Sequence, residues 1–289
     1  MNCEKPVLYH LTMTGVIIGR FMPPHNGHLY LIDFARHMVD RLYVLVCTLS
    51  HEPIPGELRY RWVQELAPTC EIVHITEEIP EARRGAAGAT EIWARSVRNA
   101  VPEQITHVFA SEDYGWDLAS HLNAQYVPVD PSRNNIPVSA SAIRTNPWEN
   151  WRFVPPAVRP WFVRHLVVIG NRDRAERLAR ELATVVVHPY REFWNQTWEH
   201  AQGRRDATPL PEEQIQRGAR ATVEALARHA NRILVHDLRS VEDLSFISRV
   251  DLVVTDEPGA LPQAVATEAT VLSVAAAEAA KAQRVLLGA

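Results

Sequence analysis

Cysteine is scarce in this 289-residue sequence, and hydrophobic runs long enough to cross a membrane are missing. Cys3, Cys47 and Cys70 show no metal-ligand spacing, and such a small odd number argues for a reducing compartment rather than a disulfide framework. Residues 1–14 lack the basic start, apolar middle and small-residue cleavage site of a signal peptide. We therefore expect a cytoplasmic protein that does not interact with membranes.

An excess of charge of either sign is also lacking. The chain has 30 Lys and Arg against 34 Asp and Glu, which gives a formal net charge of −4. This balance gives no support to general binding of nucleic acid, so we expect small-molecule partners and a local cluster of charge at any anion site. The length suffices for two domains with buried cores.

Strand-like and helix-like patterns alternate along the first half of the chain. Apolar strand patterns occur at residues 15–19, 41–47, 72–75, 106–110 and 126–130. Helical patterns occur at 28–39, 57–67, 89–100 and 139–145. Strands that are apolar nearly throughout and alternate with helices predict a parallel sheet covered on both faces, which is an α/β fold.

The stretch 149–163, rich in proline and tryptophan, predicts an ordered connector to a second, smaller α/β unit. That unit is expected to contain strands and helices at residues 165–170, 172–183, 212–229, 232–235, 251–255 and 271–274, with a surface loop at 201–211. The sequence thus predicts one domain at 1–163 and another at 164–289.

The segment Gly19-Arg-Phe-Met-Pro-Pro-His-Asn-Gly-His28 joins the first predicted strand to the first predicted helix. A helix start presents free N–H groups and the positive end of its dipole to an anion. Gly27 lets backbone and ligand approach closely. His25 and His28 can direct imidazole N–H groups at phosphate oxygens, and Arg20 can add a fixed positive charge. The segment therefore predicts a phosphate-binding site.

A second segment, Pro137-Val-Ser-Ala-Ser-Ala-Ile-Arg144, has the features of a capped helix start. Ser139 or Ser141 can cap the helix, and Arg144 in its first turns can bind a β- or γ-phosphate through its two-pronged guanidinium. By itself this pattern is typical of a plain capped helix. Because it follows the histidine segment at a domain-sized distance, we interpret it as a second phosphate contact.

Both segments resemble signatures of the nucleotidyltransferase superfamily. The first matches every fixed position of Gly-x-Phe-x-Pro-x-His-x-Gly-His, and the second resembles Ile-Ser-x-Thr-x-Ile-Arg, with Val138 and Ser141 as mild departures. Further segments resemble the NadR-type nicotinamide-nucleotide adenylyltransferases, in which a ribosylnicotinamide kinase domain follows. These segments are residues 54–62, 110–115, 129–133, 143–151 and 154–159.

The resemblance implies a Rossmann-like parallel-sheet domain that transfers AMP from ATP to nicotinamide mononucleotide (NMN), yielding NAD and pyrophosphate. ATP and NMN are the implied substrates, and Mg²⁺ is expected on the ATP phosphates with no dedicated metal site in the protein. The implied catalytic residues are His28, His25 and Arg144. The implied ligand-binding residues are Gly19, Arg20, Phe21, Gly27, Arg59, Trp93, Ser111, Glu112, Arg133, Ser139 and Ser141.

Several alternatives remain open at this point. Trp93 either stacks on the nicotinamide ring or lies in the core, Glu112 either meets the nucleotide or belongs to a solvated loop, and Arg59 either binds phosphate or is a surface helix charge. The protein could be another nucleotidyltransferase, of the pantetheine-phosphate or cytidylyl type, or a regulator that senses NAD or ATP without turnover. A homo-oligomer is compatible with the sequence.

The second half shows signs of a kinase that has lost its phosphate loop. A Gly-x-x-x-x-Gly-Lys-Ser/Thr loop should follow its first strand, and Gly170 is the first glycine. Ala175, Glu176 and Arg177 stand where the second glycine, the lysine and the hydroxyl belong, and a glutamate repels the phosphates that the lysine would attract. Asp237 is a candidate relic carboxylate. We expect a P-loop-kinase-like domain without kinase activity, or else an unrelated α/β unit.

Overall fold

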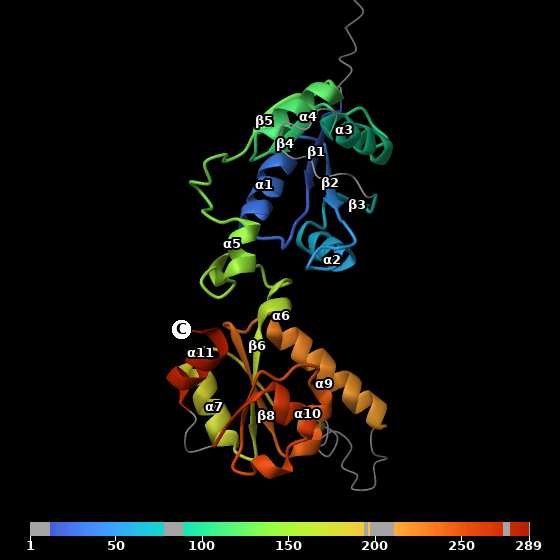
Figure 1. Ribbon diagram of the computed structural model, residues 1–289. Helices are drawn as coiled ribbons and strands as arrows, with labels where there is room; N and C mark the ends of the chain where they lie inside the picture. The colour runs from blue at the N-terminus through green and yellow to red at the C-terminus, as the bar shows by residue number, and fades with distance from the viewer. Residues whose placement is uncertain (1–11, 78–88, 194–195, 197–210, 274–277, 289) are drawn as a thin grey trace, which may run out of the picture. The chain divides into compact units, whose positions relative to one another are not determined.

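The protein is described here by a computed structural model, which covers residues 12–77, 89–193, 196, 211–273 and 278–288. The chain forms two compact units, residues 1–155 and 156–289 (Figure 1). The division between Pro155 and Pro156 lies inside the predicted connector, 149–163.

The first unit is built on a five-stranded parallel sheet with the order β3-β2-β1-β4-β5. Its strands are β1 (Thr14–Gly19), β2 (Arg41–Cys47), β3 (Glu71–Ile75), β4 (His107–Ala110) and β5 (Gln125–Pro128). The five strands predicted from apolar runs are therefore confirmed, with ends that differ by one or two residues. β1 lies at the centre of the sheet, and every residue from Thr14 to Ile18 is buried, as expected for a strand that is covered on both faces.

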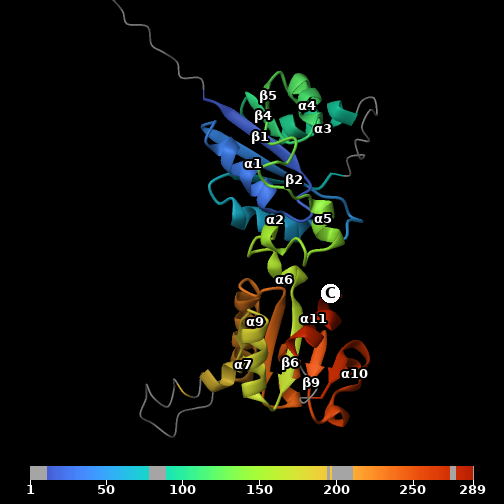
Figure 2. The ribbon, with the colours of Figure 1, turned by 90° about the vertical axis from the view of Figure 1, so that its left-hand side faces the viewer.

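Helices cover both faces of this sheet (Figure 2). On one face, α1 (Asn26–Arg36) and α2 (Gly56–Leu66) pack around Ile17, whereas α3 (Ala89–Ala100) and α4 (Tyr114–Leu122) pack on the other face around Val16 and Ile18. Successive side chains of a strand point to opposite faces, so the three consecutive apolar residues of β1 contribute to both cores. α5 (Ala140–Thr145) and a 3-10 turn, η1 (Trp151–Phe153), follow β5.

The second unit has its own five-stranded parallel sheet, with the order β10-β9-β6-β8-β7. The strands are β6 (Arg164–Ile169), β7 (Val186–Val187), β8 (Ile233–Leu238), β9 (Leu252–Val254) and β10 (Thr270–Leu272). The helical elements among its described residues are α6 (Arg159–Phe162), α7 (Arg172–Glu181), α9 (Glu212–Ala227), η2 (Val241–Phe246), η3 (Pro258–Ala260), α10 (Gln263–Glu268) and α11 (Ala279–Leu287). Side chains of α7 and α11 form the core on one face of the sheet, and η2 contributes to the core on the other.

Some short elements were not predicted. The sequence patterns did not indicate α4, β7, α10 or α11, and α1 begins at Asn26 rather than at residue 28. The loop predicted at 201–211 lies outside the described residues except for Pro211, and Cys3 also lies outside them. Cys47 is buried, as expected for a small apolar side chain in a strand.

Candidate active site

The sheet of the first unit has a point at which its strand order reverses. From β1 the chain moves outward to β2 and β3, and it then returns to pair β4 with the other side of β1. Ligands of such sheets bind beyond the carboxyl ends of the strands at this point. The loop after β1 carries the histidine segment, and Ser111 and Glu112 follow β4 directly. The fold therefore brings two predicted site segments to the same end of the sheet.

His25 and His28 form a reciprocal cap at the start of α1. His25 is the N-cap residue in extended conformation, and its ring Nδ1 accepts the backbone N–H of His28 at 3.4 Å. The ring Nδ1 of His28 accepts the backbone N–H of His25 at 3.2 Å. The two rings lie 3.8 Å apart between centroids, with planes inclined by 30°. The arrangement is a capping box in which imidazoles take the place of the usual hydroxyl and carboxylate.

This cap fixes the tautomer of both rings. A neutral imidazole has one donor and one acceptor nitrogen, so an accepting Nδ1 leaves the proton on Nε2. Burial lowers the pKa of His25 to about 4, and the nearby Arg133 charge acts in the same direction. Burial also lowers the pKa of His28 well below its usual value, helped by His25 and Arg133. At neutral pH the site therefore presents two uncharged Nε2–H donors.

Phe21 and Gly27 hold these rings in place from inside the protein. Phe21 is 1% exposed, and its ring centroid lies 4.8 Å from that of His28. Its side chain therefore packs against the histidine, whereas the sequence analysis had expected it to contact a ligand. Its φ of +49° makes the sharp turn after β1. A Cβ atom on Gly27 would lie 3.0 Å from the His25 ring, and one on Gly19 would lie 3.2 Å from the Phe21 ring. Both glycines therefore serve packing at these positions.

Arg133 and Glu112 approach the histidine pair from the loops after β5 and β4. Arg133 Nη2 lies 3.1 Å from Glu112 Oε1, and both side chains are exposed. The Arg133 charge contributes to the lowered pKa of both histidines. The carboxylate of Asp130 accepts backbone N–H groups of residues 134, 135 and 136, which folds this loop back on itself. The structure thus places Arg133 and Glu112 near the histidines, and a role of these residues in binding nucleotide stays a prediction.

The second predicted phosphate segment also reaches the histidine loop. Ser139 caps α5 by accepting the Ala142 N–H at 3.1 Å, and its Oγ lies 3.0 Å from that of Ser141. Arg144 Nη1 donates to the backbone carbonyl of Met22 at 2.5 Å. Because Met22 lies between β1 and His25, the guanidinium of Arg144 lies next to the phosphate-binding loop.

Arg59 takes a different role from the one predicted. Its side chain is fully buried, and its guanidinium donates to the carbonyls of Arg20, Cys47 and Ile54 and to the carboxylate of Glu52. A guanidinium enclosed in this way neither touches a bound phosphate nor forms an exposed helix charge. Both sequence-based interpretations of Arg59 are therefore wrong. Arg59 joins the ends of β1 and β2 through the carbonyls of Arg20 and Cys47, and it thereby stabilises the backbone of the histidine loop.

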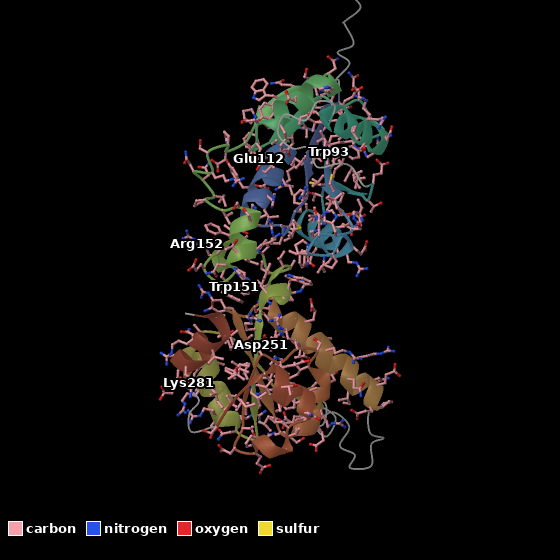
Figure 3. The ribbon with its side chains drawn as sticks, in the orientation of Figure 1. Trp93, Glu112, Trp151, Arg152, Asp251 and Lys281 are labelled. Atoms are coloured by element: carbon pink, nitrogen blue, oxygen red, sulfur yellow. The ribbon has the colours of Figure 1, made fainter. Side chains whose placement is uncertain are left out.

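Trp93 lies on α3, half-buried against the apolar core that surrounds Val16 and Ile18 (Figure 3). This packing accounts for the side chain without a ligand, and stacking on nicotinamide stays a prediction. Two further residues of the site were missed by sequence reasoning. Glu52 forms ion pairs with Arg20 and Arg59. Tyr114 donates through its hydroxyl to the carbonyl of Ile18 at 2.8 Å, which joins the start of α4 to the end of β1.

In the second unit, the segment after β6 has no phosphate loop. Only Gly170 and Asn171 separate β6 from α7, and Asn171 caps the helix by accepting the Arg174 N–H at 2.9 Å. Residues 172–174, three of the four positions between the two glycines of the motif, are helical here. Within this segment the backbone N–H groups of Gly170, Arg174 and Ala175 are bonded to the protein itself, at the carbonyl of Leu238, the side chain of Asn171 and the carbonyl of Asn171.

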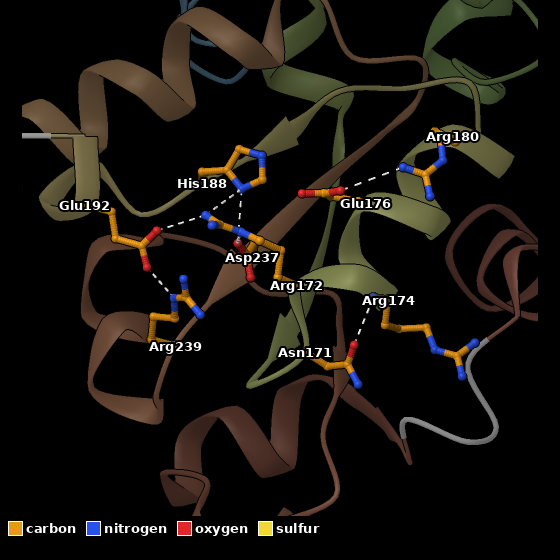
Figure 4. Close-up of polar contacts among 9 residues, drawn as sticks. All are labelled: Asn171, Arg172, Arg174, Glu176, Arg180, His188, Glu192, Asp237 and Arg239. Carbon is orange, nitrogen blue, oxygen red and sulfur yellow. Dashed lines mark hydrogen bonds and ion pairs between the residues drawn. The ribbon is translucent and has the colours of Figure 1, made fainter. Parts of the chain in front are cut away.

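One oxygen of the carboxylate that could serve a kinase site is engaged in internal contacts (Figure 4), whereas the other, Oδ1, has no hydrogen-bond partner within the described residues. Asp237, at the end of β8, is 1% exposed, and its Oδ2 lies 2.9 Å from Arg172 Nε and 3.0 Å from His188 Nδ1. Arg172 Nη2 also donates to Glu192 at 2.9 Å, and Arg239 pairs with the same glutamate. An arginine from the first turn of α7 therefore occupies the place beside Asp237.

The described residues also bear on metal binding and on membrane crossing. No three His, Cys, Asp or Glu side chains in that part of the chain group closely enough to hold a metal ion. None of its helices combines the length and apolar character that a membrane crossing requires.

Comparison with known proteins places the first unit in a family. The cytidylyltransferase-like family matches residues 16–146. Phosphopantetheine adenylyltransferase of Streptococcus pneumoniae is 30% identical over 135 residues, which cover 45% of this chain and 80% of that protein. The trifunctional NAD biosynthesis/regulator protein NadR of Salmonella typhimurium is 26% identical over 189 residues, 59% of this chain. The match spans 46% of that NadR protein.

A crystal structure of NadR in complex with NAD and AMP-PNP shares the fold of both units. Its TM-score is 0.66 at 18% sequence identity, and the alignment covers 96% of this chain and 97% of that one. This agreement confirms the predicted α/β fold class, with two domains that are each built on a parallel sheet, whereas kinase-like ancestry of the second domain stays a prediction. The chain therefore belongs to the cytidylyltransferase-like nucleotidyltransferases.

Proposed function

We propose that the protein is a nicotinamide-mononucleotide adenylyltransferase that makes NAD from NMN and ATP. The observation that carries this proposal is the reciprocal cap of His25 and His28, which leaves the proton of each ring on Nε2 at the point where the sheet order reverses. The NadR relatives support the choice of a pyridine mononucleotide, because the Salmonella protein is an NAD biosynthesis/regulator protein and the NadR crystal structure contains NAD.

In the proposed reaction, a 5′-phosphate oxygen of NMN attacks the α-phosphorus of ATP in line. A new P–O bond forms while the bond from the α-phosphorus to the bridging oxygen breaks, and pyrophosphate leaves with that electron pair. The attacking oxygen is already anionic, so no general base is required. Catalysis therefore depends on positioning and on stabilising the charge that develops.

The residues divide this work according to their chemistry. His28 and His25 donate neutral hydrogen bonds to oxygens of the transferring group, where a donor is strongest in a site of low dielectric. Arg144 and Arg133 hold the leaving pyrophosphate, and Arg20 binds either phosphate group. Ser139 and Ser141 extend the same anion-binding edge. Mg²⁺ enters with ATP as part of the substrate.

The most direct test is turnover of the full chain with NMN and ATP. We expect His28→Ala to lower kcat by about 100-fold or more, the size of effect seen when a transition-state donor is removed. His37→Ala is the matched control, because His37 is exposed at the other end of α1 and its ring contacts only the Asp33 carbonyl among the hydrogen bonds described. Circular dichroism checks that both variants fold. Near-normal turnover by His28→Ala would reject the proposed chemistry.

A second acceptor deserves comparison because the Streptococcus relative is a phosphopantetheine adenylyltransferase. NMN, nicotinate mononucleotide and phosphopantetheine should be assayed side by side at equal concentration. We expect the highest kcat/KM with a pyridine mononucleotide. Faster turnover of phosphopantetheine would assign the other transferase function, and tight binding of NAD without any turnover would indicate a regulator that senses nucleotides.

We further propose that the second unit has no kinase activity. The helix that replaces the phosphate loop and the Arg172–Asp237 pair both support this. A full-chain assay with nicotinamide riboside and ATP should show no phosphorylation, whereas transfer to NMN proceeds in the same preparation. Formation of NMN from the riboside would overturn this part of the proposal. The sparse cysteines and balanced charge support a cytoplasmic enzyme of small molecules that does not bind nucleic acid.

A further inference from the structure

A buried carboxylate lies behind the phosphate-binding loop. Glu52, between β2 and α2, has a side chain that is only 4% exposed. Its Oε2 accepts the Leu49 backbone N–H at 2.9 Å and pairs with Arg59 Nη2. Its Oε1 lies 3.6 Å from Arg20 Nε and makes no hydrogen bond within the described residues. One carboxylate thus lies between two guanidinium groups.

The two arginines differ in what surrounds them. Arg59 has no exposed surface and is fixed by the carbonyls of Arg20, Cys47 and Ile54. The side chain of Arg20 is 44% exposed, and it follows Gly19 at the entrance to the histidine loop. Arg20 is therefore held at both ends, its backbone carbonyl by Arg59 and its guanidinium by Glu52.

The charges of the cluster also suit an anion. Glu52 and Arg59 together are neutral, so adding Arg20 leaves one net positive charge at the edge of the loop. A long exposed arginine loses rotamer freedom when it binds a phosphate, and a partner that orients it beforehand removes part of that loss. The buried pair can thus orient Arg20 without cancelling the charge of the cluster.

We infer that Glu52 is a positioning residue for nucleotidyl transfer, which acts by orienting Arg20 toward the substrate phosphates. This inference rests on the proposed function for the identity of the substrates. It assigns no contact between Glu52 and substrate. If it is correct, the effect of removing the Glu52 carboxylate depends on the presence of the Arg20 guanidinium.

A double-mutant cycle with Glu52→Gln and Arg20→Met tests this dependence, because coupled residues give non-additive effects. We expect each single variant to lower kcat/KM by about tenfold, mainly through a higher KM, and the double variant to lose no more than the larger single effect. Losses that multiply to about 100-fold would overturn the inference, since a merely structural role for Glu52 is independent of Arg20. Glu57→Gln is the control, because Glu57 is an exposed residue of α2 that pairs with exposed Arg61.

Two additions keep the outcome interpretable. Should Glu52→Gln fail to fold, Glu52→Asp keeps a carboxylate in the buried site but draws it back by one methylene from Arg20, which lies 3.6 Å away in wild type, and the same cycle applies. If wild type turns over none of the acceptors, the proposed function fails, and the cycle is repeated on the Kd of ATP by titration calorimetry. Coupling in Kd then supports the positioning role separately, and independent effects contradict it.

Discussion

Acid should destabilise the first unit in a way that depends on His25. The folded protein keeps this ring neutral, since burial lowers its pKa from 6.5 to about 4. The unfolded chain binds a proton near pH 6.5, whereas the folded chain does so only near pH 4. The stability due to the neutral ring is therefore present above pH 6.5 and is lost as the pH falls. Each pH unit in that interval corresponds to about 1.4 kcal/mol.

Between pH 7 and pH 5 this amounts to a loss of about 2 kcal/mol in the free energy of unfolding. His25→Asn is the matched variant, because asparagine also caps a helix through its side-chain oxygen and does not titrate. We expect wild type to lose about 2 kcal/mol more than the variant over this interval, with all other histidines common to both.

Hydrogen exchange of the α1 amides in increasing urea, at pH 7 and pH 5, measures this difference within the full chain and reports on the first unit alone. Equal losses in wild type and variant would refute the reasoning, because they would mean that His25 does not remain neutral as the cap of α1.

Two further predictions concern the packing at Gly27 in the first unit and the ion pair of Arg172 with Asp237 in the second. Gly27→Ala places a Cβ atom 3.0 Å from the His25 ring, so we expect kcat to fall about tenfold with an unchanged fold, while Gly259→Ala, which meets no atom within 4 Å, leaves kcat unchanged in the same assay. Arg172→Met removes the arginine that pairs with buried Asp237, and it should lower the free energy of unfolding of the second unit by about 2 to 3 kcal/mol. This loss is smaller than that for breaking a fully buried ion pair, because the Arg172 side chain is 33% exposed. Urea denaturation checks the second prediction, and an unchanged midpoint would contradict it.

Much of the fold could be predicted because the strands of both sheets are buried on two faces and are therefore apolar nearly throughout. Helix α4 escaped prediction because its buried side consists of Gly115, Leu118 and Ala119, which give a weak apolar pattern among polar neighbours. Strand β7 has only two residues, Val186 and Val187, and is recognised only through its pairing with β8.

The site was predictable where local spacing determines geometry. His25 and His28 stand three positions apart across a helix start, the spacing of N-cap and N3, so both rings necessarily meet the same turn. The direction of Arg59 was not predictable, because the spacing of charges along α2 does not show that a guanidinium turns inward to Glu52. That contact depends on loops after two different strands, and it exists only once the sheet has formed.

In the second unit too, features set by neighbouring residues could be predicted, whereas contacts between residues far apart in the sequence could not. The replacements at Ala175, Glu176 and Arg177 were sufficient to predict a lost phosphate loop. The contact of Arg172 with Asp237 joins residues 65 positions apart and required the pairing of β6 with β8.

The central claim is that His25 and His28 are neutral Nε2–H donors to substrate phosphates. Long-range ¹H–¹⁵N NMR of the ¹⁵N-histidine-labelled full chain at pH 7 reads the tautomer of each ring directly. We predict that both rings carry the proton on Nε2 and that both Nε2 signals shift when NMN and a non-hydrolysable ATP analogue are added. Protonated Nδ1 atoms, or signals that do not respond to the two nucleotides, would contradict the account.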